Sequence, residues 1–165
     1  MNKRIIDYTE FKNLVSEICR QISKDNWRPD YIVGISRGGL LPAVMISHYF
    51  NIPMKPLQVS LRDNIETVSD LGMAEDAFDG KNILIVDDIN DQGTTLNWIM
   101  QDWPSGCFPY DERWEHVWSG NVRFAVVVDN LSSQCSIGMN YWGTEVNKAE
   151  EDVWIDFPYE EWWTK

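Results

Sequence analysis

Three carboxylates and a Gly-Thr-Thr turn follow one strongly apolar run in this chain of 165 residues. The run Ile83–Val86 leads into these polar residues, which are Asp87, Asp88, Asp91, Gly93, Thr94 and Thr95. Backbone N–H groups at such a loop and helix start bind anions, and threonine hydroxyls add donors. Carboxylates do not bind phosphate, but they accept hydrogen bonds from the vicinal hydroxyls of a sugar. The pattern therefore indicates a ligand that carries a phosphate beside a polyol, as a ribose 5-phosphate does.

A second turn with anion-binding chemistry follows an earlier apolar run. Tyr31–Ile35 ends in Ser36, Arg37, Gly38 and Gly39. Glycines let the backbone approach an anion, and the Arg37 guanidinium offers a forked set of donors. The turn is not a P-loop, because no Gly-Lys-Ser/Thr follows at the required spacing. Glycine-rich turns after strands are often structural, so it is the position of this turn ahead of the acidic loop that favours a binding role.

An alternation of strands and helices is expected to position both loops. The sequence predicts helices over Thr9–Lys24, over Leu40–Phe50 and from Leu96 onward. Apolar runs predict strands over Tyr31–Ile35, Met54–Leu61, Asn82–Val86 and Val122–Val128. We therefore predict an α/β fold in which helices flank a mainly parallel sheet, with ligands at the carboxyl ends of the strands. The length fits a single domain over residues 1–165.

Three segments fall outside this alternation. Residues 61–79 are polar, weakly periodic and long for a connection, so we expect a flexible lid or a disordered segment there. Residues 102–120 break every period and are expected to be an insertion, whose tryptophans would lie at an interface or cap a binding site. Residues 129–165, whose C-terminal part mixes aromatic and acidic side chains, are expected to form a small C-terminal hood.

The chain is acidic, with a net charge of −12 from 26 Asp and Glu against 14 Lys and Arg. Most of the excess lies in residues 81–165, which hold 15 acids and 5 bases. This balance excludes a large nucleic-acid footprint and disfavours binding to an anionic membrane. Three widely spaced cysteines do not suit a zinc site or a disulfide framework. Without a signal peptide or an apolar run of spanning length, a cytoplasmic protein is expected.

Residues 83–95 resemble the signature loop of the type I phosphoribosyltransferases, a family that binds phosphoribosyl pyrophosphate (PRPP). That loop has four apolar residues, two acids, two variable residues, then Asp, Thr, Gly, any residue and Thr. Gln92 stands where the family usually has the first of these threonines, and every other position fits. The paired acids alone would also suit a response-regulator receiver domain. That alternative leaves residues 1–82 unexplained and lacks the lysine expected on a later strand.

Two further segments resemble the bacterial and archaeal xanthine-guanine-type members of this family. Ser36–Gly39 resembles their pyrophosphate loop, in which the peptide before the arginine is often cis. Trp154–Glu160 resembles their Trp-Ile-x-x-Pro-aromatic-acid tail, in which the tryptophan stacks on the purine and the next residue contacts its edge. The resemblance therefore implies that the hood over residues 129–165 binds the base.

The resemblance implies a purine salvage enzyme that uses Mg²⁺ to transfer the 5-phosphoribosyl group from PRPP to a nitrogenous base. The expected acceptor is a 6-oxopurine (guanine, xanthine or hypoxanthine), and the products are a nucleoside 5′-monophosphate and pyrophosphate. The residues implied in catalysis are Arg37, Asp87, Asp88 and Asp91. Those implied in PRPP binding are Ser36, Arg37, Gly38, Gly39, Asp87, Asp88, Asp91, Gln92, Gly93, Thr94 and Thr95. Asp88 is the candidate direct ligand of Mg²⁺, which otherwise binds through PRPP and water alone.

The implied base contacts are Asp91, Asn130, Trp154 and Ile155. In the 6-oxopurine enzymes a lysine at the end of the strand after the signature loop donates to the purine O6. Here Asn130 stands at that position. An amide can donate or accept, so a 6-oxopurine and a different base both stay open as acceptors.

Two alternatives to a purine-salvage enzyme also stay open: a non-catalytic PRPP sensor and a phosphoribosyltransferase for a different base. PRPP-binding regulators usually carry a basic face or a DNA-binding domain, and this acidic chain shows neither, which favours the enzyme. Because family members commonly form dimers or larger assemblies, we expect a homo-oligomer without nucleic-acid or membrane partners.

Overall fold

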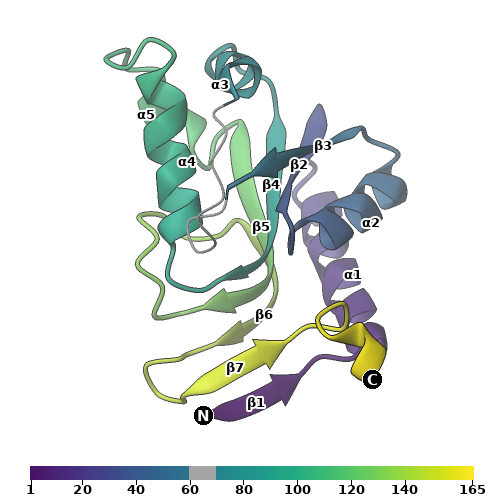
Figure 1. Ribbon diagram of the computed structural model, residues 1–165. Coiled ribbons are helices and arrows are strands. Elements are labelled where there is room, and N and C mark those ends of the chain that lie inside the picture. The colour runs from purple at the N-terminus through teal and green to yellow at the C-terminus, as the bar shows by residue number, and fades with distance from the viewer. Residues whose placement is uncertain (60–69) are drawn as a thin grey trace.

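A five-stranded parallel sheet forms the centre of the computed structural model, which describes residues 1–59 and 70–165 (Figure 1). The strand order within the described residues is β3-β2-β4-β5-β6. The bounds are β2 (Tyr31–Ser36), β3 (Met54–Gln58), β4 (Ile83–Asn90), β5 (Val122–Asn130) and β6 (Tyr141–Val146). Each neighbouring pair in this sheet is parallel, which confirms the predicted α/β class.

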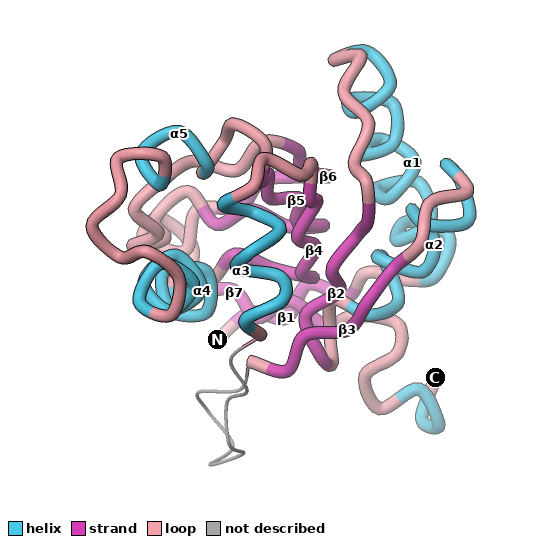
Figure 2. The backbone as a smooth tube through the Cα atoms, turned by 90° about the horizontal axis from the view of Figure 1, so that it is seen from above, coloured by secondary structure: helices cyan, strands magenta, loops and turns pink. Residues whose placement is uncertain are grey.

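Helices cover both faces of the sheet (Figure 2). One face carries α1 (Tyr8–Lys24) and α2 (Leu40–Phe50), and the other carries α3 (Leu71–Phe78), α4 (Thr94–Ser105) and α5 (Trp114–Val117). A hydrophobic core lies on each face of the sheet. Because successive strand residues point to opposite faces, the strands contribute side chains to both cores. In β4, for example, Leu84 packs in the core under α1 and α2, and Ile85 packs in the core under α3 and α4.

The strand β4 is longer than its apolar run predicts. It continues past Val86 through the paired acids to Asn90. Parallel pairing with β5 continues alongside, with Asp87 opposite Val126 and Asn90 opposite Asp129. The paired acids therefore lie on the end of a central strand rather than in a loop, and the sheet restrains their backbone.

A second, two-stranded sheet joins the two ends of the described chain. The strands β1 (Asn2–Ile5) and β7 (Val153–Asp156) pair in parallel (Figure 1). This arrangement differs from the predicted hood over residues 129–165, because β6 belongs to the central sheet and the unpredicted N-terminal strand β1 supports β7. The buried Asp156 carboxylate accepts from Lys165 at 2.8 Å and lies 3.3 Å from the Lys3 ammonium, which fastens the tail to β1.

The predicted lid over residues 61–79 corresponds to two different parts of the chain. Residues 61–69 lie outside the described residues. The following residues form α3, which begins at the N-cap Asp70 and buries Met73, Ala74, Ala77 and Phe78 in the core. The prediction of a lid or a disordered segment is therefore wrong for Leu71–Phe78, because the apolar side of this short helix packs against α4 and the sheet.

The segment 102–120 packs into the main core. Trp103 and Trp114 are buried there, and each of their rings lies 5.9 Å from the Trp118 ring. The first part of the segment is the end of α4, and α5 follows. None of these three tryptophans is among the described residues that line the cavities below. In the described part of the chain, every helix is too short or too polar to span a bilayer.

Candidate functional site

Two neighbouring cavities open at the carboxyl ends of β2 and β4, the edge where parallel sheets bind ligands. The first, which we call the signature-loop cavity, has a volume of about 380 Å³. Its walls are the ends of β2 and β4, the connection after β4 and the first turn of α4. The predicted PRPP-binding residues that line it are Ser36, Asp87, Asp88, Asp91, Gln92, Gly93, Thr94 and Thr95.

The start of α4 has the geometry of an anion-binding turn. Gly93 is the N-cap, with φ at 84°, a left-handed conformation that glycine adopts without penalty. A Cβ at this position would also overlap the backbone of Cys135. Gly93 has no side chain that could accept hydrogen bonds from the first-turn N–H groups of α4. These N–H groups therefore remain available to a ligand in the cavity. This is the arrangement expected to hold a phosphate.

The paired acids at the end of β4 are held by short local hydrogen bonds. The backbone N–H of Asp88 donates to Oδ1 of Asp87 at 2.9 Å, and the N–H of Ile89 donates to Oδ1 of Asp88 at 2.8 Å. The Tyr159 hydroxyl donates to the other oxygen of Asp88, Oδ2, at 2.7 Å. Tyr159 belongs to the C-terminal tail, so the tail directly contacts one of the predicted sugar-binding carboxylates.

The glycine turn after β2 packs closely against β4. The peptide bond between Ser36 and Arg37 is cis, as is often the case in the family that the turn resembles. A Cβ at Gly38 would overlap the Asp88 carboxylate, and one at Gly39 would overlap the Val86 carbonyl oxygen. The glycines therefore bring the exposed Arg37 close to the acidic end of β4.

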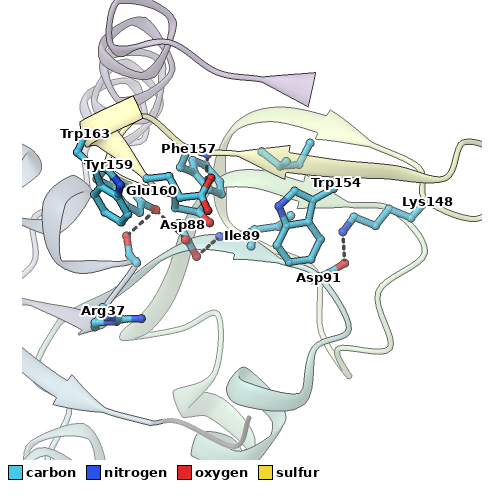
Figure 3. Close-up of a pocket in the computed structure, with 13 residues that line it drawn as sticks. Arg37, Asp88, Ile89, Asp91, Lys148, Trp154, Phe157, Tyr159, Glu160 and Trp163 are labelled. Carbon is cyan, nitrogen blue, oxygen red and sulfur yellow. Dashed lines mark hydrogen bonds and ion pairs between the residues drawn. The ribbon is translucent and has the colours of Figure 1, made fainter. Parts of the chain in front are cut away.

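The second cavity, which we call the tail cavity, has a volume of about 580 Å³ (Figure 3). The predicted residues that line it are Arg37, Gly38, Asp88, Asp91, Trp154 and Ile155. Asp88, Ile89 and Asp91 line both cavities, so the end of β4 is their common wall. Of the predicted site residues, all of which the structure describes, Gly39 and Asn130 line neither cavity.

Lys148 is a residue of the tail cavity that the sequence interpretation missed. Its Nζ lies 3.0 Å from Oδ1 of Asp91 and 5.7 Å from the centroid of the Trp154 ring (Figure 3). Lys148 comes from the connection between β6 and β7, and its side chain is 20% exposed. A signal was present in the sequence, since Lys148 is the only Lys or Arg between Arg123 and Lys165.

Asn130 is buried behind this cavity. Its side-chain amide N–H donates to the Asp91 carbonyl at 2.8 Å, and its Oδ1 accepts from the backbone N–H of Lys148 at 3.0 Å. The Ser132 hydroxyl also donates to this oxygen, at 3.0 Å. The residue at the position of the family lysine therefore bridges the backbones of Asp91 and Lys148. Its predicted contact with the base stays a prediction.

Burial raises the pKa of two tail residues beside Asp88. It raises the pKa of the Tyr159 phenol, and the adjacent Asp88 carboxylate raises it further. Tyr159 therefore remains a hydrogen-bond donor at every physiological pH. Burial also raises the pKa of the Glu160 carboxyl, which lines the same cavity.

The sequence that forms these cavities matches a known family over most of the chain. A family model described as the phosphoribosyl transferase domain matches residues 2–160. The chain belongs to the phosphoribosyltransferase family. The matched range includes the signature loop, the glycine turn and the tail as far as Glu160.

Relatives of this phosphoribosyltransferase include xanthine-guanine-type enzymes. A xanthine-guanine phosphoribosyltransferase from Idiomarina loihiensis is 27% identical over 160 residues, which cover 94% of this chain and 85% of the relative. Xanthine phosphoribosyltransferase 1 from Saccharomyces cerevisiae is 30% identical over 126 residues, which span 61% of this chain and only 60% of the yeast protein. The predicted resemblance to type I phosphoribosyltransferases of the xanthine-guanine type is confirmed.

Solved structures show the same fold. The purine phosphoribosyltransferase from Pyrococcus horikoshii superposes with a TM-score of 0.68 at 24% identity, covering 98% of this chain and 96% of that one. A Helicobacter pylori xanthine-guanine-hypoxanthine phosphoribosyltransferase also gives a TM-score of 0.68, at 18% identity, and covers 99% of this chain and 97% of that one. At these identities the likeness establishes the phosphoribosyltransferase fold.

Among the described residues, the candidate site offers oxygen ligands but no complete set of metal ligands. Outside residues 60–69, no group of three or more His, Cys, Asp or Glu side chains is placed to hold a metal ion. Asp87 and Asp88 stand at the shared end of β4. Mg²⁺ typically binds through one or two carboxylates together with water and substrate phosphates. The donor set therefore fits a Mg²⁺ ion that arrives with a phosphorylated substrate.

Proposed function

We propose that this phosphoribosyltransferase transfers the 5-phosphoribosyl group from PRPP to a 6-oxopurine, with release of pyrophosphate. The acceptor would be guanine, xanthine or hypoxanthine. The observation that carries this proposal is the grouping of Lys148, Asp91 and Trp154 around the tail cavity, beside a signature-loop cavity suited to a sugar phosphate. The xanthine-guanine and purine enzymes among the relatives support the same class of acceptor.

Three side chains of the tail cavity would each recognise a different feature of the base. Trp154 is 43% exposed and offers a flat aromatic face on which a purine can stack. The Lys148 ammonium has donors and no acceptor, so it favours a carbonyl oxygen on the ring. An exocyclic amine at the same place would turn N–H groups toward the ammonium, so we expect oxopurines to be preferred. The Asp91 carboxylate, 3.0 Å from Lys148, accepts from a ring N–H nearby.

The reaction breaks the bond between the anomeric carbon and pyrophosphate, and forms a bond from that carbon to a ring nitrogen. Asp87 and Asp88 accept from the ribose hydroxyls and orient the sugar. Asp91 accepts the proton that the base loses. Arg37 and the backbone of the glycine turn stabilise the negative charge on the departing pyrophosphate. Mg²⁺ bound with PRPP would add positive charge at the pyrophosphate oxygens.

The test is pyrophosphate release from PRPP and Mg²⁺ with a panel of guanine, xanthine, hypoxanthine, adenine and orotate. We expect turnover with at least one oxopurine and little with adenine or orotate. Activity confined to adenine or orotate would contradict the proposed specificity. PRPP binding without turnover across the panel would favour the sensor instead.

Comparing substitutions at two lysines measures the contribution of Lys148 to base recognition. Lys148→Met keeps most of the unbranched side chain and removes its charge, and we expect kcat/KM for the preferred oxopurine to fall about 10- to 100-fold. KM for PRPP should stay within about twofold. The matched control is Lys81→Met, because Lys81 also pairs with an aspartate, Asp76 at 3.3 Å, but lies away from both cavities.

A further inference from the structure

Tyr159 connects the C-terminal tail to the sugar side of the site. Its hydroxyl donates to Oδ2 of Asp88 at 2.7 Å and lies 3.2 Å from the carbonyl oxygen of Gly38 (Figure 3). A phenol has a single O–H, and a charged acceptor at the shorter distance takes it. Tyr159 therefore donates primarily to the Asp88 carboxylate, and neither the signature loop nor the glycine turn contains a side chain equivalent to it.

The Tyr159 ring is rigidly held. It stacks on the buried Phe157 ring with centroids 5.6 Å apart, and meets the buried Phe11 ring of α1 edge-on at 5.9 Å. The next part of the tail is tied down by Lys165, whose ammonium donates to the carbonyls of Phe157 and Glu160 at 2.8 Å each. The position of the hydroxyl is thus set by the core and the tail together, not by Asp88 alone.

The Asp88 carboxylate is oriented from two sides. The backbone N–H of Ile89 donates to Oδ1, and Tyr159 donates to Oδ2, which also lies directly over Gly38. A carboxylate can otherwise rotate about its terminal torsion, which has broad and shallow preferences. Two donors on opposite oxygens remove that freedom before a ligand arrives. Because a carboxylate has about four lone-pair sites, both oxygens retain the capacity to accept further hydrogen bonds.

We infer that Tyr159 is a positioning residue for PRPP binding, which holds the Asp88 carboxylate in the orientation that receives the ribose hydroxyls. The inference rests on the proposed function, in which Asp88 binds the sugar. Tyr159 lies five residues after Trp154 on the same tail, which β7 and β1 anchor. The tail therefore supplies both Trp154, on which the base would stack, and Tyr159, which orients the Asp88 carboxylate that would bind the sugar.

The test is the variant Tyr159→Phe, which keeps both ring contacts and removes only the hydroxyl. Isothermal titration with PRPP and Mg²⁺, in the absence of any base, measures the affinity directly. We expect PRPP to bind about tenfold more weakly, since the Asp88 carboxylate loses one of the two donors that hold its orientation before PRPP binds. In steady-state assays KM for PRPP should rise by the same factor, and KM for the preferred oxopurine should stay within about twofold.

The matched control is Tyr141→Phe. The Tyr141 hydroxyl also donates to a carboxylate, that of Asp25, at 2.7 Å. Neither Tyr141 nor Asp25 lines either cavity. Tyr141→Phe should leave PRPP affinity unchanged, whatever it does to the melting temperature. An equal loss in both variants would overturn the inference, because it would indicate general destabilisation. Unchanged or tighter PRPP binding by Tyr159→Phe would overturn it as well.

The same titration separates this inference from the proposed function. Wild-type protein that binds PRPP but transfers it to none of the bases would contradict the proposed reaction, and the effect of Tyr159→Phe on binding would still decide the role of Tyr159. Wild-type protein that does not bind PRPP would overturn both.

Discussion

The signature-loop cavity and the tail cavity lie side by side, but the chain builds them in different ways. Ten of the residues that line the signature-loop cavity are consecutive, from Asp87 to Leu96. The tail cavity draws its walls from the glycine turn, the end of β4, the connection before β7 and the tail itself. A contiguous site can be seen as a motif in the sequence, whereas a site assembled from four segments depends on how the sheets bring them together.

The wall that the two cavities share contains residues of the contiguous loop that also contact residues of the tail cavity. Asp88 and Asp91 belong to the contiguous loop, and each also bonds to a residue of the assembled cavity: Asp88 to Tyr159, and Asp91 to Lys148. Because the two substrates would meet at this wall, substitutions on it should affect the transfer step that joins them. Substitutions on either side of it should affect one substrate alone.

The largest effect is expected on the shared wall. Asp91→Asn keeps the size of the side chain and removes the charge and the proton acceptor. We expect kcat to fall about 10²- to 10⁴-fold, the range typical of a lost general base, with PRPP affinity largely kept. Pre-steady-state turnover and PRPP titration measure the two quantities separately. Loss of PRPP binding with turnover retained at saturation would contradict the role given to Asp91.

On the tail side, Trp154→Ala should weaken the base alone. Stacking of a base on an aromatic ring contributes about 1–3 kcal/mol, so we expect KM for the purine to rise about 10- to 100-fold. KM for PRPP should change less than about threefold, since Trp154 lines only the tail cavity. Trp162→Ala is the control, because Trp162 is 67% exposed and lines neither cavity. Equal effects of the two substitutions would contradict a stacking role.

In the signature-loop cavity, alanine substitutions at two glycines distinguish the effect of backbone strain from the effect of a steric clash at the cavity. Gly93 and Gly80 both have positive φ, 84° and 89°, so alanine at either costs about 1 kcal/mol in conformation. Only at Gly93 would the new Cβ overlap another segment, the backbone at Cys135. Gly93→Ala should weaken PRPP about tenfold or more and lower the melting temperature further than Gly80→Ala, which should leave PRPP affinity intact. Calorimetry and thermal unfolding report the two effects.

The smallest effect is expected from the anchor of the tail. Hydrogen bonds from Lys165 and then from Lys3 lower the pKa of Asp156. Its carboxylate therefore stabilises the fold above the ordinary carboxyl pKa near 3.9, and this contribution is lost as the pH falls through the lowered value. Lys165→Met should reduce the melting temperature by about 2–4 °C at pH 7. The difference from wild type should shrink as the pH falls through the lowered pKa of Asp156.

Lys12→Met is the comparison for that measurement, because Lys12 is exposed on α1. Its melting temperature should follow that of the wild type at each pH. A Lys165→Met difference that stays constant from pH 7 to pH 2 would show that packing of the lysine stem, rather than the charge on Asp156, accounts for the effect.

Most of the central sheet could be predicted, and the misses have a physical cause. The helix α2 and the strands β2 and β5 begin at the predicted residues, and α1 begins one residue before the predicted Thr9. Amphipathic spacing and fully apolar runs indicate burial directly. The extension of β4 through Asp87 and Asp88 could not be predicted, since pairing with β5 holds polar residues in the strand. The strand β1 was missed because its partner β7 lies about 150 residues away.

The signature-loop cavity can be predicted from local sequence, because the strand, the acids and the helix start that form it are neighbours along the chain. The tail cavity depends on tertiary contacts. The tertiary structure buried Asn130, brought Lys148 from the β6–β7 connection to Asp91, and set the Tyr159 hydroxyl against Asp88. Contacts between segments so far apart depend on the register of β1 with β7 and on the packing of the tail against α1, which no local pattern encodes.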